Sequence, residues 1–178
     1  KLGLAQWPSR SDVGLRHRLR VPRLPPCLQS EYRVALYVKP SDLRVRDTNE
    51  TIGDGLFSCL SYKKDEVIAE FHGRECWISQ ITELLETQPQ RGYYCIRTRE
   101  GRVFDTYDNY ISRHCLASYA NDAFNCLNLS TMQHASCNCR LDIMYHSSTL
   151  GDLSIRLVCD VPKLSCHSEL LWNYDNNF

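Results

Sequence analysis

Short strand-like runs dominate the chain, and this pattern limits its possible folds more than any other feature. The runs combine β-branched, aromatic and aliphatic residues, and segments that favour turns separate them. They occur at 32–38, 43–45, 66–71, 93–98, 103–106 and 154–161. Strands this short build small sheets, so we predict a mainly β (α+β) fold of several small sheets.

One segment, 76–88, has the spacing of a helix. Its apolar residues fall on one helical face: Trp77, Ile78, Ile81, Leu84 and Leu85. Pro89 follows the segment, where a helix commonly ends. The sequence shows no internal repeat, and a chain of 178 residues can bury its own core. We therefore predict a single domain over 31–178 with one clear helix.

Residues 1–30 differ in composition from the rest of the chain. They contain four of the seven prolines and six basic residues against one acid. We expect this segment to be an arm or linker. Residues 31–178 carry the remaining 15 basic and 20 acidic residues. A basic arm is compatible with nucleic-acid contact and an acidic body with a basic substrate, and the alternative is a solvated, flexible arm.

The ten cysteines do not suggest a disulfide framework. Five of them stand singly in apolar or strand-like runs, where free cysteine packs as a small hydrophobic residue: Cys59, Cys76, Cys95, Cys115 and Cys159. We therefore expect a reduced, intracellular protein. No run approaches the ~18 consecutive apolar residues that span a membrane, so we expect no membrane partner.

Three motifs stand out as candidates for chemistry. The first is Gly53-Asp54-Gly55-Leu56-Phe57, whose paired glycines allow close approach of the backbone to a ligand. The second runs from Cys115 to Ala123 and contains the polar pair Asn121-Asp122. The third, 168–175, reads Ser-Glu-Leu-Leu-Trp-Asn-Tyr-Asp. Taken singly, each also fits an ordinary explanation: a turn, a helix end and strand packing.

In this order the motifs resemble those of the SET-domain protein lysine methyltransferases. The glycine motif is similar to the family's opening Gly-x-Gly. Ser118 to Ala123 is similar to its Arg-Phe-Ile-Asn-His-Ser signature, and Glu169 to Tyr174 to its closing Glu-Leu-aromatic-Asp-Tyr. Glu70 to Gly73 and Cys137 to Leu141 resemble a turn and a strand that lie between these motifs in the family.

The resemblance covers about 43–178 and implies the SET-domain fold, with a C-terminal pseudoknot that brings Tyr174 beside Asn121. It implies transfer of a methyl group from S-adenosylmethionine to a protein lysine, with S-adenosylhomocysteine as the product. The implied cofactor-binding residues are Gly53, Asp54, Gly55, Phe57, Tyr119, Asn121 and Asp122. The implied catalytic and channel residues are Tyr174, Tyr94 and Trp172.

Within this scheme, Asn121 would hydrogen-bond the amino-acid end of the cofactor, and Tyr174 would orient the methyl group and the amine. Methyl transfer is an in-line displacement, so the neutral amine must be held at attack distance. Aromatic walls exclude water and disfavour the ammonium form. Trp172 occupies the position that influences how many methyl groups fit. The alternative for Tyr94 and Trp172 is plain core packing.

Three positions depart from the family pattern: Ser118 replaces an arginine, Asp122 a histidine and Cys137 a proline. An acid at 122 could weaken the hold on the cofactor's carboxylate, or could contribute only its backbone. These departures support a second hypothesis, a SET-like module that binds a protein without turnover. Because the chain ends four residues after Tyr174, we expect no zinc-binding segment after the domain.

Zinc is the remaining alternative, because four potential ligands lie close in sequence: Cys126, His134, Cys137 and Cys139. Their spacing matches no common zinc finger, so we predict a surface loop and no metal. No local motif suggests a Cys-His nucleophile of a hydrolase. We expect a basic, lysine-containing protein or peptide as substrate, such as a histone tail, and a nuclear location.

Overall fold

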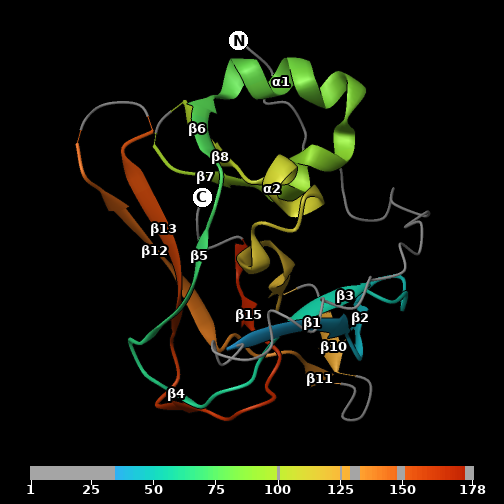
Figure 1. Cartoon of the computed structure of the whole chain (residues 1–178). Helices are drawn as coiled ribbons and strands as arrows, with labels where there is room; N and C mark the ends of the chain where they lie inside the picture. Colours follow the sequence, from blue (N-terminus) through green and yellow to red (C-terminus); the bar gives the residue numbers. More distant parts are fainter. Residues whose placement is uncertain (1–34, 100, 125, 129–132, 148–150, 175–178) are drawn as a thin grey trace, which may run out of the picture.

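The computed structural model describes residues 35–99, 101–124, 126–128, 133–147 and 151–174. Within these residues, short strands form six small sheets of two or three strands each (Figure 1). The predicted arm, 1–30, lies outside the described residues. The prediction of several small sheets is confirmed.

The most extensive strand pairing joins β12 (Cys139–Tyr145) and β13 (Leu153–Cys159), which are antiparallel over seven residues each. The second neighbour of β13 is β5 (Val67–Phe71). The predicted strands 66–71 and 154–161 are thus confirmed with small shifts at their ends. Ile155 and Leu157 of β13 are fully buried and place the core against this sheet.

Three other small sheets pair strands from the N-terminal part of the described chain with one another or with later strands. β1 (Leu36–Pro40) pairs with β3 (Asp54–Ser58). β2 (Leu43–Val45) pairs with β10 (Cys126–Asn128), which also pairs with β11 (Gln133–His134). The third sheet joins β4 (Tyr62–Lys63) to β14 (Lys163–Leu164). Gly55, the second glycine of the Gly-x-Gly motif, is the second residue of β3.

A three-stranded sheet carries the main helix. Its central strand, β8 (Arg102–Asp105), lies between β6 (Arg74–Trp77) and β7 (Cys95–Arg97). The predicted hairpin of 93–98 with 103–106 is confirmed in β7 and β8. Helix α1 (Ile78–Thr87) continues directly from β6 (Figure 1).

The predicted start of the helix at residue 76 is wrong. Cys76 and Trp77 belong to β6, where they pair with Val103 and Arg102 of β8. Pairing with β8 therefore outweighs the helical spacing. Trp77 is 45% exposed and lies at the N-cap of α1 instead of on its apolar face.

Three short helical segments were not predicted. Tyr93 and Tyr94, expected in a strand, end the 3₁₀ helix η3 (Pro89–Tyr94). Helix α2 (Tyr107–Ile111) follows β8, and the 3₁₀ helix η4 (Leu116–Tyr119) leads into β9 (Asn121–Asp122). Helix α2 and η4 carry the polypeptide from the β6-β8-β7 sheet to the Asn121-Asp122 pair.

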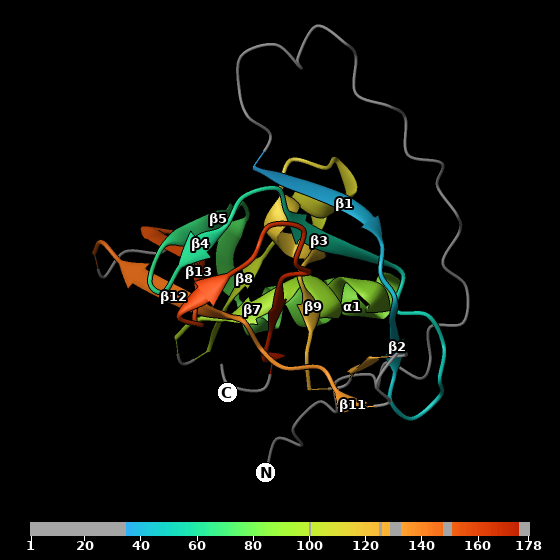
Figure 2. The ribbon, with the colours of Figure 1, turned by 90° about the horizontal axis from the view of Figure 1, so that it is seen from below.

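The C-terminal segment crosses the molecule between elements that are far apart in sequence. Its strand β15 (Leu171–Trp172) runs parallel to β9. On its other side, the Leu170 amide donates to the Leu56 carbonyl of β3 at 2.8 Å. Figure 2 shows this segment, in red, passing between β3 and β9. The arrangement is the predicted C-terminal pseudoknot.

Burial reinforces the crossing. Leu56, Leu157 and Leu170 come from β3, β13 and the C-terminal segment, and all three are fully buried in one apolar cluster. Removing such side chains from water provides the main stabilisation of the fold.

In the described part of the chain, no helix is long and apolar enough to cross a bilayer.

Candidate active site

The crossing places Tyr174 beside residues 120–122. The Tyr174 hydroxyl donates to the Ala120 carbonyl oxygen at 2.8 Å, and its backbone N–H donates to the Asp122 carboxylate at 3.4 Å. The ring packs against Trp172, with 4.4 Å between the ring centroids. The predicted proximity of Tyr174 to Asn121 is therefore present in the structure.

Asn121 is held by two acceptors. Its Nδ2 group donates to the backbone carbonyl of Asp54 at 3.2 Å and to the Glu169 carboxylate at 3.0 Å. The residue is only 6% exposed. Both amide hydrogens are thus used, and within the described residues Oδ1 remains as the atom that a ligand can use.

Gly55 has a packing role beyond the close backbone approach that was predicted. A Cβ at this position would collide with Oε1 of Glu169 and would lie 2.9 Å from its Cδ and 3.2 Å from Nδ2 of Asn121. Only glycine leaves room for this carboxylate. Gly53 has a φ of 89°, a conformation that also favours glycine.

Phe57 lies on the same strand but is covered by protein side chains. It is 5% exposed and stacks on Tyr37 with a centroid separation of 5.5 Å. The Lys39 ammonium lies 4.2 Å from the ring centroid, within the range of a cation–π interaction. A cofactor contact by Phe57 therefore stays a prediction.

Asp122 uses its carboxylate to hold the crossing. It is 2% exposed, and its Oδ1 accepts hydrogen bonds from the backbone N–H groups of Phe124 at 3.1 Å and Tyr174 at 3.4 Å. These bonds give the acid, which stands where the family pattern has histidine, a local structural function.

A row of tyrosine rings connects Tyr94 to this region. Tyr94 stacks on Tyr110 at 4.0 Å, and Tyr110 contacts Tyr119 at 4.8 Å. Tyr119 directly precedes Ala120, the acceptor of the Tyr174 hydroxyl. Burial is the main cause that raises the pKa of Tyr119 above its ordinary value, and the nearby Tyr110 raises it further. The row therefore joins the predicted Tyr94 and Tyr119 through a residue that was not predicted.

The row continues outward through α2, where Tyr107 contacts Tyr94 at 5.6 Å. Tyr107 also lines a shallow surface concavity of about 480 Å³. Tyr107 and Tyr110 were not predicted. Their three-residue spacing, which places two rings on one side of a helical turn, is the signal that could have indicated them.

Trp172 is the third predicted channel residue. It is 6% exposed and packs between Phe71, at 6.3 Å, and Tyr174. Its indole Nε1 is buried and has no hydrogen-bond partner within the described residues. A buried donor without a partner is costly, so a ligand that accepts this hydrogen bond would relieve the cost.

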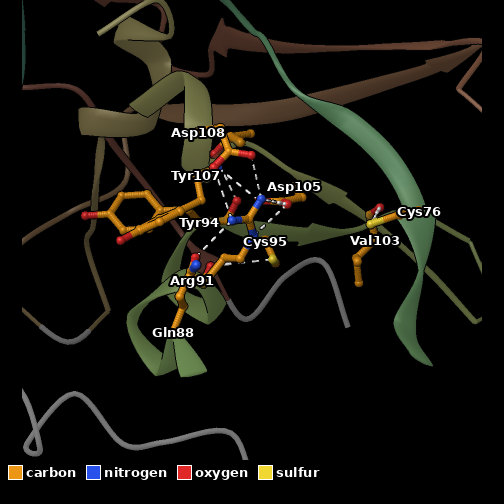
Figure 3. A network of polar contacts seen from close by, with 10 residues as sticks. Cys76, Gln88, Arg91, Tyr94, Cys95, Val103, Asp105, Tyr107 and Asp108 are labelled. Carbon is orange, nitrogen blue, oxygen red and sulfur yellow. Dashed lines mark hydrogen bonds and ion pairs between the residues drawn. The ribbon is translucent and has the colours of Figure 1, made fainter. Parts of the chain in front are cut away.

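An ion-pair network centred on the buried Arg91 links the elements that carry the tyrosine row. Arg91 is 4% exposed and donates two hydrogen bonds to Asp105, at 2.6 and 2.8 Å, and two to Asp108, at 2.8 and 3.1 Å (Figure 3). Burial alone would lower the pKa of Arg91, but the bonds to Asp108 and Asp105 raise it. Arg91 therefore stays charged and ties η3 to β8 and α2.

Ser118, which replaces the family's arginine, joins this support. Its hydroxyl donates to Thr106 Oγ1 at 3.0 Å, and the Thr106 hydroxyl donates to the Tyr94 carbonyl at 2.9 Å. The Thr106 amide also donates to this carbonyl, at 3.0 Å. The backbone of Tyr94 is thus fixed relative to η4.

The four cysteine and histidine residues considered as zinc ligands do not converge. His134 and Cys137 are exposed, whereas Cys126 and Cys139 are buried. Among the described residues, no group of three or more His, Cys, Asp or Glu side chains could hold a metal ion. Burial raises the pKa of the Cys95 and Cys139 thiols to about 12, so neither is a thiolate at neutral pH.

The fold, with its C-terminal crossing, is that of the SET-domain methyltransferases, which confirms the predicted fold class. Two similar solved structures are apo ctPRC2 with two substitutions in Ezh2, and ctPRC2 in an autoinhibited conformation bound to S-adenosylmethionine. Each has a TM-score of 0.55 and 19% identity and covers 81% of this chain. A third is CpSET8 from Cryptosporidium, with a TM-score of 0.52, 16% identity and 80% coverage of this chain.

The matched region is a small part of the PRC2 chains, since this chain spans 15% of their length and 58% of CpSET8. No protein-family model and no curated protein matches the sequence. At these identities the likeness establishes the fold.

Proposed function

We propose that this protein is a protein-lysine N-methyltransferase that uses S-adenosylmethionine. The observation that carries the proposal is the placement of the Tyr174 hydroxyl, 2.8 Å from the Ala120 carbonyl and next to Asn121, at the crossing of a SET-domain fold. In the similar ctPRC2 structure, S-adenosylmethionine is bound. The residues proposed to hold it here are the predicted set: Gly53, Asp54, Gly55, Phe57, Tyr119, Asn121 and Asp122.

The chemistry of the site suits this cofactor. S-adenosylmethionine carries positive charge on its sulfonium and α-ammonium groups. Around Asn121 the structure has two acceptors: its own Oδ1 and the Glu169 carboxylate, which accepts from its Nδ2 group. The Nε1 donor of Trp172, which has no partner among the described residues, lies on the same C-terminal segment as Glu169. Cationic groups are favoured beside carboxylates, so these acceptors fit the positively charged groups of the cofactor.

When bound, the cofactor would supply an electrophilic methyl group and a neutral sulfur leaving group. Tyr174 would provide a phenol oxygen that its hydrogen bond to Ala120 holds in place. The Tyr174 phenol oxygen and the Ala120 carbonyl oxygen would together orient the attacking amine. Tyr94, Tyr119 and Trp172 would form apolar walls that exclude water. Such walls favour the neutral form of lysine, which is the nucleophile.

The proposed substrate is a basic, lysine-containing protein or peptide, such as a histone tail. Charge supports this choice, since residues 31–178 carry 20 acidic and 15 basic residues. An acidic body attracts basic partners over distances of about 10 Å in moderate salt. A nuclear location follows for a histone substrate. Nucleic-acid contact by residues 1–30 is a separate proposal, tested by whether deleting that arm removes salt-dependent DNA binding.

The experiment is transfer of labelled methyl from S-adenosylmethionine to core histones, with Tyr174→Phe as the matched blank. We expect label on a histone with the natural chain and a much lower signal with the variant. Equal labelling by both would remove Tyr174 from the mechanism. Absence of label on histones and on a nuclear protein extract would contradict methyltransferase activity.

A second candidate is a SET-like module that binds a protein without turnover. Two observations favour it: Asp122 uses its carboxylate to hold the crossing, and Ser118 hydrogen-bonds Thr106. Both substitutions are thus absorbed structurally, without evident benefit to a cofactor. Calorimetry with S-adenosylhomocysteine separates the two, because an enzyme must bind this product and a pure binding module need not.

A further inference from the structure

Glu169 is a partly buried carboxylate that the methyl-transfer chemistry leaves unused. Its Oε1 accepts a hydrogen bond from Asn121 Nδ2 at 3.0 Å, and its Oε2 accepts one from the Ser41 hydroxyl at 2.8 Å. It therefore touches a proposed cofactor-binding residue directly while lying behind it.

Both the main chain and the side chain of Glu169 are fixed. Its carbonyl accepts a hydrogen bond from Asn138 Nδ2 at 2.7 Å, and its backbone forms an isolated bridge with Phe57. The missing side chain of Gly55 leaves the space that Oε1 fills. Ser41 is fixed in turn, because its Oγ accepts from the Leu43 amide at 3.0 Å and so directs its hydrogen to Glu169.

This arrangement determines which way the Asn121 amide faces. An amide can rotate by half a turn, which exchanges its NH₂ donor and its oxygen acceptor. The rotated form would place Oδ1 against two oxygens, the Glu169 carboxylate and the Asp54 carbonyl. Two acceptors therefore hold the NH₂ group inward and leave Oδ1 as the ligand-facing function.

An acceptor at this position discriminates between the two ends of an amino acid. Oδ1 can accept a hydrogen bond from an α-ammonium group, and it cannot donate one to an α-carboxylate. The negative charge of Glu169, one hydrogen bond behind Asn121, adds an electrostatic preference for a cation. Lys39 and Asp42 are the charged groups that act on Glu169 from β1 and the turn after it.

We propose that Glu169 is a positioning residue, whose carboxylate orients Asn121 so that Oδ1 accepts a hydrogen bond from the α-ammonium group of the cofactor. The inference rests on the proposed function, because it presumes that the cofactor binds at Asn121. It adds a residue whose effect is transmitted through Asn121 and is specific for one chemical group of the cofactor.

The test measures binding of two probes by calorimetry: S-adenosylhomocysteine, and its analogue that lacks only the α-amino group. The natural chain should bind the first at least tenfold more tightly. Glu169→Ala should weaken binding of S-adenosylhomocysteine about tenfold and leave binding of the analogue nearly unchanged. Glu169→Gln should restore the preference, since its amide oxygen can accept from Asn121 while its NH₂ group donates to Ser41.

A double variant tests whether the effect passes through Asn121. In an Asn121→Ala background, Glu169→Ala should cause no further loss of affinity, because the residue it positions is gone. Thermal melting of each variant shows that the folded protein is being compared, and Glu169→Gln serves as the isosteric control.

Three results would overturn the inference, and they are distinguishable. Equal loss of both probes in Glu169→Ala would indicate a purely structural role. Additive losses in the double variant would show that Glu169 does not act through Asn121. Absence of S-adenosylhomocysteine binding by the natural chain would contradict the proposed function itself, and the inference with it.

Discussion

Tyr174 and Ala120 are joined by a hydrogen bond of 2.8 Å from the phenol hydroxyl to the backbone carbonyl, although 54 residues separate them in sequence. The Tyr174 amide is bound to the Asp122 carboxylate in the same place. The residue is therefore anchored at both its backbone and its hydroxyl. Removal of the hydroxyl alone should leave the ring in position.

Tyr174→Phe should lower methyl transfer at least tenfold, because the oxygen that orients the amine is lost. The free energy of unfolding should fall by only about 1 kcal/mol, the value of one hydrogen bond. Initial rates with labelled cofactor measure the first effect, and denaturant unfolding the second. Affinity for S-adenosylhomocysteine should stay within a few-fold. A rate like that of the natural chain would contradict the assignment.

Asn138→Ala should loosen the C-terminal crossing. Its Nδ2 donates to the Glu169 carbonyl at 2.7 Å, and its Oδ1 accepts from the Leu171 amide at 2.9 Å. Loss of two such bonds should lower the free energy of unfolding by about 2 kcal/mol.

The matched control for this variant is Asn109→Ala. Asn109 is also half-buried, and its side chain makes no hydrogen bond within the described residues. Its replacement in α2 should therefore have little effect on unfolding by denaturant. Similar losses in both variants would show that the two bonds of Asn138 contribute nothing particular to the crossing.

Asp108→Asn should change how stability depends on pH. The hydrogen bond from Arg91 holds the pKa of Asp108 below its ordinary value. This stabilisation is therefore complete above the ordinary aspartate pKa of about 3.9 and is lost as pH falls through the lowered value. The variant should melt earlier than the natural chain at pH 7, and the difference should shrink as pH falls below about 4.

The corresponding control is Asp152→Asn, because the Asp152 carboxylate makes no hydrogen bond or ion pair within the described residues. Its melting temperature should follow that of the natural chain across the same pH range. A constant deficit of Asp108→Asn at every pH would contradict the ionic explanation.

Gly55→Ala should lower both stability and cofactor affinity. The added methyl group would displace the Glu169 carboxylate and crowd Asn121 Nδ2, which would lie 3.2 Å away. Melting and calorimetry with S-adenosylhomocysteine measure the two effects. In a Glu169→Ala background the same substitution should cost less, since the displaced group is gone. An equal cost in both backgrounds would locate the strain elsewhere.

Local sequence patterns predicted the elements that depend on local preference. Alternation in 154–161 and 66–71 predicted β13 and β5, and the spacing of Ile78, Ile81 and Leu85 predicted α1. The start of α1 was wrong because Trp77 pairs with Arg102 of β8, a partner 25 residues away. Such pairing is decided by tertiary contacts, which outweigh a helical pattern at its first turn.

Site residues that belong to a sequence motif could be predicted, whereas residues placed by tertiary packing could not. Asn121 and Tyr174 stand in recognisable motifs, and the structure brings them together. Tyr110 lies in a five-residue helix, and its spacing from Tyr107 indicates only that the two rings share one side of a turn. The position of its ring between Tyr94 and Tyr119 depends on tertiary packing. The contact of Glu169 with Asn121 likewise depends on space left by Gly55, which is visible only in three dimensions.

The crossing of residues 168–174 has a consequence for biosynthesis. A ribosome releases β3 and β9 long before it releases the strand that lies between them. Contacts of such large sequence separation form slowly, because a long loop must close before they stabilise anything. The hairpins of β12 with β13 and of β7 with β8 can form on the emerging chain. The Asn121 amide is oriented only once Glu169 has reached its place in the crossing. The ability to bind a ligand should therefore appear abruptly, near the end of folding.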